Sequence, residues 1–341
     1  MIVPILQGLL SWKKAPITWS LILLNVLVLV LCNVFGRTAD EKLDELMQND
    51  YYVETQGRAY AQYLSEQSPV KYPTFLLDLA ERVLGGESSR VSLLGQLAFR
   101  DQDFLDEAAI TAFKGDQVAF SFWKSKLSYS KKLQENHPSF LLGLSSDDFS
   151  FSKWITYIFV HSGWFHLFGN MLFLLVFGAV LERQIGGLAL LVVFLLSGVF
   201  GAGVFSLMTG VTTSPLVGAS GAVSGVMSLF CVLNWRQPVR FMYMLFLPVR
   251  GYMGFVFLPA WVAFVMWLVA DLAGYLSSVP ELGGVAHTAH IGGEFAGAVV
   301  GFTLYLLRHK LKVSNSELPT QFLMAEAKPI GQLHPFLPPL H

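Results

Sequence analysis

The stretch Leu216-Val217-Gly218-Ala219-Ser220-Gly221 places a serine among small residues at the start of a short apolar segment. Much further along the chain, Ala289-His290-Ile291-Gly292-Gly293 places a histidine at the start of another apolar segment. A serine is a weak nucleophile until a positioned base accepts its proton. If the two side chains lie at one depth of a membrane, this pair predicts nucleophilic catalysis within the bilayer.

The composition is that of a membrane protein with some water-soluble mass. The 341 residues are 53% hydrophobic and 14% charged, whereas soluble domains carry about 25% charged residues. The formal net charge of −1 gives no basis for nucleic-acid binding. Cys32 and Cys231 both lie in apolar runs, so we expect no disulfide framework.

Six apolar runs approach the roughly 20 residues that a transmembrane helix needs, and they predict an all-α polytopic membrane protein with a six-helix bundle. The runs cover residues 16–35, 166–181, 188–208, 219–235, 254–276 and 287–307. The first run exceeds the apolar core of a signal peptide, and no small-x-small site follows it, so we expect a retained helix. The fourth run is short, and the Thr-, Gly- and Pro-rich residues 210–215 before it predict a loop that dips into the membrane.

The placement of basic residues predicts the orientation of the chain. Thirteen of the 23 Lys and Arg residues lie between Arg37 and Lys153. With the N-terminus in the cytoplasm, six spans put the other ten on the cytoplasmic side, and the outer loops 209–218 and 277–286 contain none. We therefore expect the chain to be divided into a cytoplasmic N-terminus (1–15), a first transmembrane helix (16–35), an extracytoplasmic first-loop domain (36–150), a catalytic membrane core (151–308) and a cytoplasmic tail (309–341). Six spans without an added seventh, and the lack of a transit peptide, lead us to expect a bacterial inner membrane.

The first loop differs in character from the rest of the chain. It holds 18 of the 24 acidic residues, and apolar residues recur at helical spacing in residues 40–67, 74–84, 91–99 and 104–113. The sequence therefore predicts a small helical domain. A basic patch at Lys124–Lys132 is read as a solvated helix face in preference to a lipid contact, and the loop contains no metal-ligand spacing.

Polar residues inside apolar spans are costly and are therefore candidates for function. Counting back from the arginine at the inner end of each span, at about 1.5 Å per residue, puts four polar residues about 20 to 27 Å away. They are Asn170, Ser220, His166 and His290. All four therefore lie at roughly one level, several ångströms below the outer surface of the membrane. Glycines spaced by four residues predict close packing of the segments that carry Ser220 and His290; they are Gly221 and Gly225 in one, and Gly293, Gly297 and Gly301 in the other.

These residues predict a reaction in which His290 accepts the proton of Ser220. His166, Asn170 and the backbone N–H of Ser220 are the donors available to a tetrahedral oxyanion. No acidic residue stands out to orient His290, so we favour a Ser–His dyad. Of the two candidates, Glu294 lies a turn deeper, and Asp271 is read more simply as bonding a neighbouring helix.

Plainer interpretations exist for each residue. Ser220 can serve in helix packing or N-capping, His290 can be a hydrogen-bonded core residue, and Asn170 can bond between helices. His161 and His287 are expected to support the loops beside them.

Four motifs together resemble the rhomboid family of intramembrane serine proteases. They are His161-x4-His166-x3-Asn170-Met171, Gly178-x3-Glu182-Arg183, Gly218-Ala219-Ser220-Gly221 and Ala289-His290-x2-Gly293-x3-Gly297. The resemblance implies a six-span fold that cleaves single-span membrane proteins near the outer face of the bilayer, with no metal, nucleotide or other cofactor.

The resemblance also implies a role for each matching residue. Ser220 falls on the nucleophile and His290 on the base. His166, Asn170 and Gly218 fall on the oxyanion side, and His161, His287, Gly221, Gly293 and Gly297 on supporting positions. The Glu182-Arg183 pair is implied to be structural. Where many bacterial relatives have a tyrosine stacked under the catalytic histidine, this chain has Ser224, so His290 needs another support.

Two other functions fit parts of the pattern. A rhomboid-like protein without activity would bind membrane proteins and not cleave them, although such relatives usually lack the serine or the histidine. A metal-handling protein would use His161, His166, His287, His290 and Glu294 as ligands. The predicted partners are therefore transmembrane substrates and the lipid bilayer, and the sequence does not indicate an oligomeric state.

Overall fold

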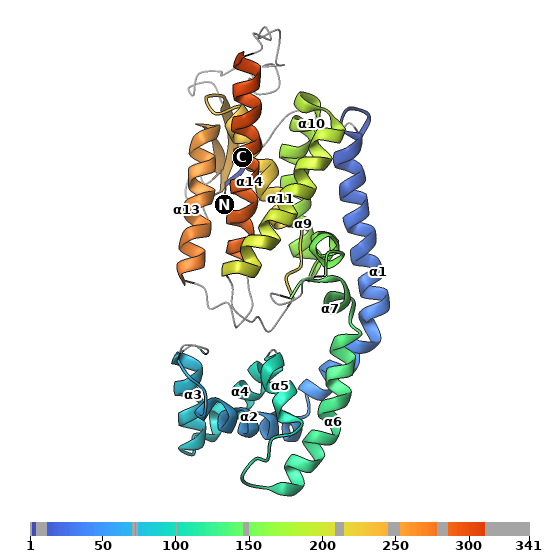
Figure 1. Cartoon of the computed structure of the whole chain (residues 1–341), viewed down its shortest axis with the longest axis vertical. Helices are drawn as coiled ribbons and strands as arrows, with labels where there is room; N and C mark the ends of the chain where they lie inside the picture. Colours follow the sequence, from blue (N-terminus) through green and yellow to red (C-terminus); the bar gives the residue numbers. More distant parts are fainter. Residues whose placement is uncertain are drawn as a thin grey trace, which may run out of the picture.

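The structure is a computed structural model that describes residues 2–4, 12–69, 72, 74–99, 101–145, 150–208, 215–244, 253–277 and 286–310. It consists of a bundle of long apolar helices and a smaller helical domain at one end of the bundle (Figure 1). Each part has its own hydrophobic core. The smaller domain is built from the first loop.

Five helices are long and apolar enough to cross a membrane, in agreement with the predicted all-helical membrane fold. The second of them, Trp164–Ile185, is one continuous run that contains a π-helical segment in its middle. Along the chain the apolar helices are α1 (Pro16–Met47), α9 (Trp164–Phe173), η4 (Leu174–Gly178), α10 (Ala179–Ile185), α11 (Gly187–Met208), α12 (Ser220–Leu233), α13 (Ala260–Ser277) and α14 (His287–Lys310). At 14 residues, α12 is shorter than a full crossing, as the short fourth run predicted.

The first helix continues past the predicted end of its span at residue 35. It runs without a break to Met47, and both Leu46 and Met47 pack against the core of the first-loop domain. A single helix therefore joins the bundle to that domain. The helices α6 (Gln117–Glu135) and α7 (Pro138–Leu142) bring the chain back toward the bundle (Figure 1).

The first-loop domain is helical, as predicted. Its elements are α2 (Asp50–Ser65), α3 (Thr74–Leu84), η2 (Ser88–Arg90), α4 (Val91–Ala98), α5 (Gln102–Ala108), α6 (Gln117–Glu135) and α7 (Pro138–Leu142). The predicted helix over residues 40–67 is divided between α1 and α2, because the side chain of Asn49 accepts the amide of Tyr52 and caps a new helix. The basic patch Lys124–Lys132 lies on α6.

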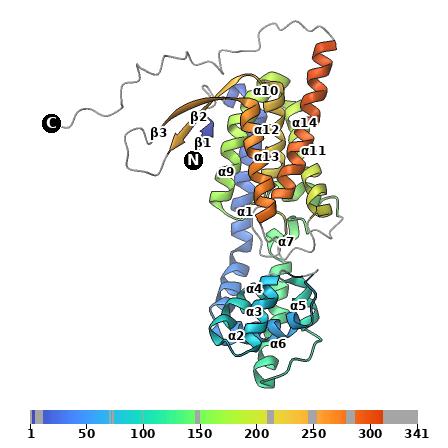
Figure 2. The same cartoon turned by 90° about the vertical axis from the view of Figure 1, so that its left-hand side faces the viewer.

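A three-stranded antiparallel sheet was not predicted. Its order is β1 (Ile2–Pro4), β2 (Pro238–Met244) and β3 (Met253–Pro259), and it lies beside the end of the bundle away from the first-loop domain (Figure 2). The fifth span, predicted from residue 254, therefore begins as a strand, and its helix starts only at Ala260. A short apolar run cannot be assigned to strand or helix by periodicity alone; here the pairing of β3 with β2 decides it.

Three short helical elements complete the described chain: η1 (Trp12–Lys14), α8 (Lys153–Thr156) and η3 (Tyr157–Phe159). Several predictions fall outside the described residues. These are most of the N-terminal segment 1–15, residues 209–214 of the outer loop 209–218 with all but the last residue of the dipping loop 210–215, residues 278–285 of the outer loop 277–286, and the tail beyond Lys310.

Candidate active site

Helices α12 and α14 pack backbone against backbone at the turns that carry Ser220 and His290. A Cβ atom at Gly293 would overlap the carbonyl oxygen of Gly221, and one at Gly221 would lie 3.1 Å from the carbonyl oxygen of Ala289. Ser220 and His290 are the chain neighbours of residues in this contact. The glycine spacing predicted this approach, because only residues without side chains let two helix axes come so close.

Ser220 is the first residue of α12, and the loop before it is held by hydrogen bonds from two backbone amides. The amide of Gly218 donates to the carbonyl oxygen of Tyr157 at 3.0 Å, and the amide of Ala219 donates to Nε2 of His161 at 3.4 Å. The first amides of a helix have no partner within the helix and carry positive partial charge. Ser220 therefore sits where an anion is favoured.

Gly218 contributes space to the site. Its φ of 122° is unfavourable for residues with a side chain, and a Cβ atom there would lie 2.7 Å from Cε1 and 2.8 Å from Nε2 of His166. Its amide is already bonded to Tyr157, so the predicted oxyanion role does not extend to that N–H group. What Gly218 provides is a close approach between its own loop and His166.

His166 and Asn170 lie on α9, facing the loop that leads to Ser220. The Ser162 hydroxyl is 3.0 Å from Nδ1 of His166, and the Asn170 side chain donates to the His166 carbonyl oxygen at 3.1 Å. Nδ2 of Asn170 would lie 3.8 Å from a Cβ atom at Gly218. Two of the predicted oxyanion donors thus share one helix face beside Gly218.

His161 is buried beside His166, and its ring links two segments of backbone. Nδ1 lies 3.3 Å from the carbonyl oxygen of Phe159, and Nε2 accepts the amide of Ala219. One tautomer, with the proton on Nδ1, satisfies both bonds. His161 therefore supports the loop before Ser220, as its position in the sequence had suggested.

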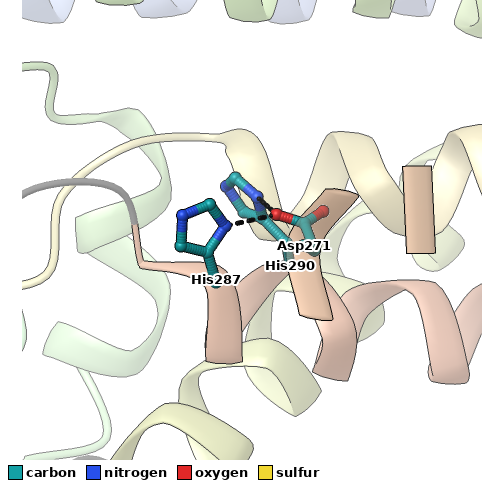
Figure 3. Close-up of side chains that lie close together, drawn as sticks. All are labelled: Asp271, His287 and His290. Atoms are coloured by element: carbon teal, nitrogen blue, oxygen red, sulfur yellow. Dashed lines mark hydrogen bonds and ion pairs between the residues drawn. The ribbon is translucent and has the colours of Figure 1, made fainter. Parts of the chain in front are cut away.

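His287 and His290 both bond to Asp271, which sequence reasoning had weighed and set aside. Oδ1 of Asp271, on α13, is 2.6 Å from Nδ1 of His287 and 2.9 Å from Nδ1 of His290 (Figure 3). Asp271 does bond a neighbouring helix, but its partner is the candidate base itself. The feature of the sequence that marks Asp271 as a candidate functional residue is the position of its carboxylate within an apolar span.

Among the described residues, the side chains of Asp271, His287 and His290 also form a group that could hold a metal ion. Their ligand atoms all lie within 4.8 Å of one another. Two further residues at this end of the bundle had no sequence signal: Tyr157, whose carbonyl oxygen accepts the Gly218 amide, and Ser162 beside His166.

Glu182 lies outside this constellation and has a structural role. Its carboxylate accepts the amides of Ile17 and Thr18 and the Thr18 hydroxyl, each at 2.8 Å. It therefore caps the first turn of α1, where the resemblance had implied a structural part for the Glu182-Arg183 pair.

Comparison with known proteins agrees with this architecture. The model of the Rhomboid domain matches residues 148–307. Rhomboid-like protein 11, chloroplastic, of Arabidopsis thaliana is 30% identical over 156 residues, which cover 45% of this chain and 52% of that protein. Rhomboid protease GlpG of Yersinia pestis (strain Pestoides F) is 30% identical over 150 residues, 44% of this chain and 47% of its own length.

A mammalian protein shows the same relationship. Rhomboid-related protein 2 of Mus musculus is 29% identical over 163 residues, 45% of this chain and 48% of that protein. The chain thus spans about half the length of the curated relatives it matches. Residues 148–307 therefore match the Rhomboid domain, and they contain every residue of the candidate site.

Proposed function

We propose that this protein is an intramembrane serine endopeptidase that cleaves transmembrane segments with Ser220 as nucleophile and His290 as base. One observation carries the proposal: the turn of Ser220 packs directly against the turn of His290, through Gly221, Ala289 and Gly293. The family match adds support, because GlpG is named as a protease.

The proposed reaction uses side chains of this protein, one backbone amide and a water molecule. Nε2 of His290 accepts the proton of Ser220 as Oγ attacks the peptide carbonyl carbon. The tetrahedral oxyanion accepts hydrogen bonds from His166, from Asn170 and from the backbone N–H of Ser220. His290 then gives its proton to the leaving amine, and a water molecule hydrolyses the acyl-enzyme by the same steps.

The surroundings of His166 suit it as an oxyanion donor. When the Ser162 hydroxyl donates to Nδ1 of His166, the ring proton is on Nε2, which lies so close to Gly218 that a Cβ atom there would be only 2.8 Å from it. Removing one donor of this kind typically costs about 2.7–4 kcal/mol of transition-state stabilisation.

The proposed substrates are single-span membrane proteins, cut near the outer face of the membrane. The candidate site lies toward the end of the bundle that faces the first-loop domain (Figure 1). If the N- and C-termini are cytoplasmic, as the basic residues predict, this end is the outer one. The first-loop domain is then extracytoplasmic. A bacterial inner membrane remains our proposed location.

The test combines active-site labelling with substrate cleavage. Detergent-solubilised protein is treated with a fluorophosphonate, and proteoliposomes are assayed with a single-span membrane protein. We expect wild type to be labelled and to cleave, and Ser220→Ala and His290→Ala to do neither. Ser228→Ala is the matched serine control, because Ser228 lies on α12 and bonds the Glu294 carbonyl oxygen; His137→Gln, in the first-loop domain, is the histidine control.

Other outcomes lead to other functions. Folded wild-type protein that binds a transmembrane peptide but is neither labelled nor active contradicts the proposal and favours a catalytically silent binding protein. Activity that is lost on adding a chelator, and restored by a metal, favours a metal-dependent protein.

A further inference from the structure

We infer that Asp271 is a positioning residue of this reaction, holding His290 in the tautomer and orientation that a general base requires. The inference rests on the proposed function. It extends the Ser220–His290 pair to a chain of three side chains from α12, α14 and α13.

One carboxylate oxygen of Asp271 bonds to two imidazole rings. Oδ1 of Asp271 lies 2.9 Å from Nδ1 of His290 and 2.6 Å from Nδ1 of His287 (Figure 3). The side chains of all three residues are 14% to 19% exposed. Hydrogen bonds to a charged group in such shielded surroundings are stronger than surface contacts, which water and salt weaken.

The hydrogen bond to Asp271 determines the tautomer of each histidine. An ionised carboxylate can only accept hydrogen bonds, so each Nδ1 atom that bonds to it must carry a proton. In a neutral imidazole the proton on Nδ1 leaves a lone pair on Nε2. This lone pair is what His290 needs to accept the proton of Ser220. After that transfer, the negative charge of Asp271 stabilises the imidazolium.

The same hydrogen bond fixes the orientation of the His290 ring. His290 is held from one side by Asp271 on α13, while its own helix is fixed against α12 through Gly293. The position one turn after Ser220 is Ser224, which brings no aromatic ring to the site. Among the described residues, Asp271 supplies the hydrogen bond that fixes the imidazole.

His287 shares the carboxylate, and the structure makes room for it. A Cβ atom at Gly274, one turn after Asp271 on α13, would overlap the His287 ring. Asp271 and Gly274 thus form one face of α13 that receives both histidines. His287 helps to hold the carboxylate in place for His290.

Metal binding by the cluster, and positioning of His290 by Glu294 in place of Asp271, are less consistent with the geometry. Tetrahedral zinc bonds of about 2.0–2.2 Å would place its ligand atoms about 3.3 Å apart, whereas the distances here, 2.6 and 2.9 Å, are those of hydrogen bonds. Glu294 has a buried carboxylate oxygen, Oε2, without a hydrogen-bond partner in the described residues, but its carboxylate does not bond to His290.

The decisive variant is Asp271→Asn, which keeps the size of the side chain and removes its charge. The Asn amide can donate to Nδ1 of His290 and so favour the wrong tautomer. We expect kcat for cleavage in proteoliposomes to fall by roughly 10²- to 10⁴-fold, with KM changed by less than about threefold. Asp271→Ala should regain part of its rate in the presence of formate, a small carboxylate, and not with acetamide.

A second measurement needs no variant of Asp271. Nitrogen-15 NMR of wild type labelled at histidine reports which ring nitrogen of His290 is protonated, and the resonance is assigned by its loss in His290→Gln. We expect Nδ1–H. A neutral His290 with its proton on Nε2 overturns the inference, even if Asp271→Asn fails to fold.

The outcomes separate this inference from the proposed function. If wild type cleaves, Ser220→Ala and His290→Ala are inactive, and Asp271→Asn is folded and fully active, Asp271 is not a positioning residue but the protease assignment stands. If wild type neither labels nor cleaves, the proposed function fails first. If chelators abolish wild-type activity and zinc restores it, the cluster binds a metal and our inference is wrong.

Discussion

Gly293 of α14 packs against the carbonyl group of Gly221 of α12, and a side chain at Gly293 would occupy the space of that carbonyl oxygen. The contact lies one residue after Ser220 and three residues after His290. The distance between the proposed nucleophile and base is therefore set by the backbones of two helices. Side-chain conformation has little freedom to correct an error in that spacing.

Gly293→Ala should separate the two helices and abolish activity. Overpacking of this kind typically costs about 1–3 kcal/mol of stability, and loss of the Ser220–His290 alignment should remove labelling even in protein that remains folded. Thermal unfolding in detergent and fluorophosphonate labelling measure the two effects. Gly203→Ala on α11 is the control, because its Cβ atom would make only ordinary contacts with Trp154 at 3.6 to 3.9 Å. Equal effects of the two substitutions would contradict the prediction.

Gly218→Ala should reduce activity far more than its effect on backbone strain explains. A left-handed conformation costs a residue with a side chain about 1–2 kcal/mol, and the new methyl group would in addition meet the ring of His166 at 2.7 Å. Gly186→Ala separates the two causes, since Gly186 has a φ of 86° but no atom within 4 Å of a Cβ. We expect both variants to lose thermal stability, Gly218→Ala by more because of the added contact with His166, and substrate cleavage to be lost only at Gly218.

Glu182→Gln should destabilise the bundle and leave the chemistry of the folded protein intact. The carboxylate accepts three hydrogen bonds at the start of α1. The glutamine side chain has an NH2 group in place of one carboxylate oxygen, and this group cannot accept a hydrogen bond from a backbone N–H. A donor left unsatisfied in a buried position costs about 1–3 kcal/mol. Chemical unfolding of the detergent-solubilised protein measures the loss. Glu41→Gln, in an exposed pair with Arg37, is the control and should be nearly neutral.

Asp101→Asn should stabilise the first-loop domain at neutral pH. Burial raises the pKa of the Asp101 carboxyl, and this effect outweighs the hydrogen bonds from the Phe104 amide and the Tyr60 hydroxyl. The folded domain therefore binds this proton more tightly than the unfolded chain does. The contribution of Asp101 to the stability of the domain is fully present below its ordinary pKa of about 3.9, and it is lost as pH rises through the raised pKa of the folded state. Asparagine caps a helix as well as aspartate does, without the cost of a buried charge.

Hydrogen exchange of α2 and α5 in the full chain tests this prediction. The asparagine variant should be more protected than wild type at about pH 7, and the difference should shrink as pH falls toward about 4. A difference that does not change with pH would show that the charge of Asp101 is not its cause. Asp103→Asn, a nearby carboxyl one residue into the same helix, is the control.

Much of the fold follows from local patterns. The apolar runs predicted the long helices, and in the first-loop domain the helix predicted over residues 74–84 coincides with α3. The close approach of α12 and α14 was also legible, because glycine at every fourth position leaves a strip of bare backbone along one helix face. The break between α1 and α2 was missed, since a continuous helical spacing hides a cap such as Asn49.

The sequence by itself predicted most of the helical segments and the residues that are chemically capable of the proposed reaction, because apolar periodicity and motif spacing are properties of neighbouring residues. Only the tertiary structure decided how distant segments meet. Strand β3 is a strand because β2 lies beside it, the Gly218 amide is bonded because Tyr157 lies opposite, and Asp271 holds His290 because α13 packs on α14. A hydrogen bond requires the distance between its donor and acceptor to be right within a few tenths of an ångström. Between separate elements this distance is fixed only when the whole chain has packed.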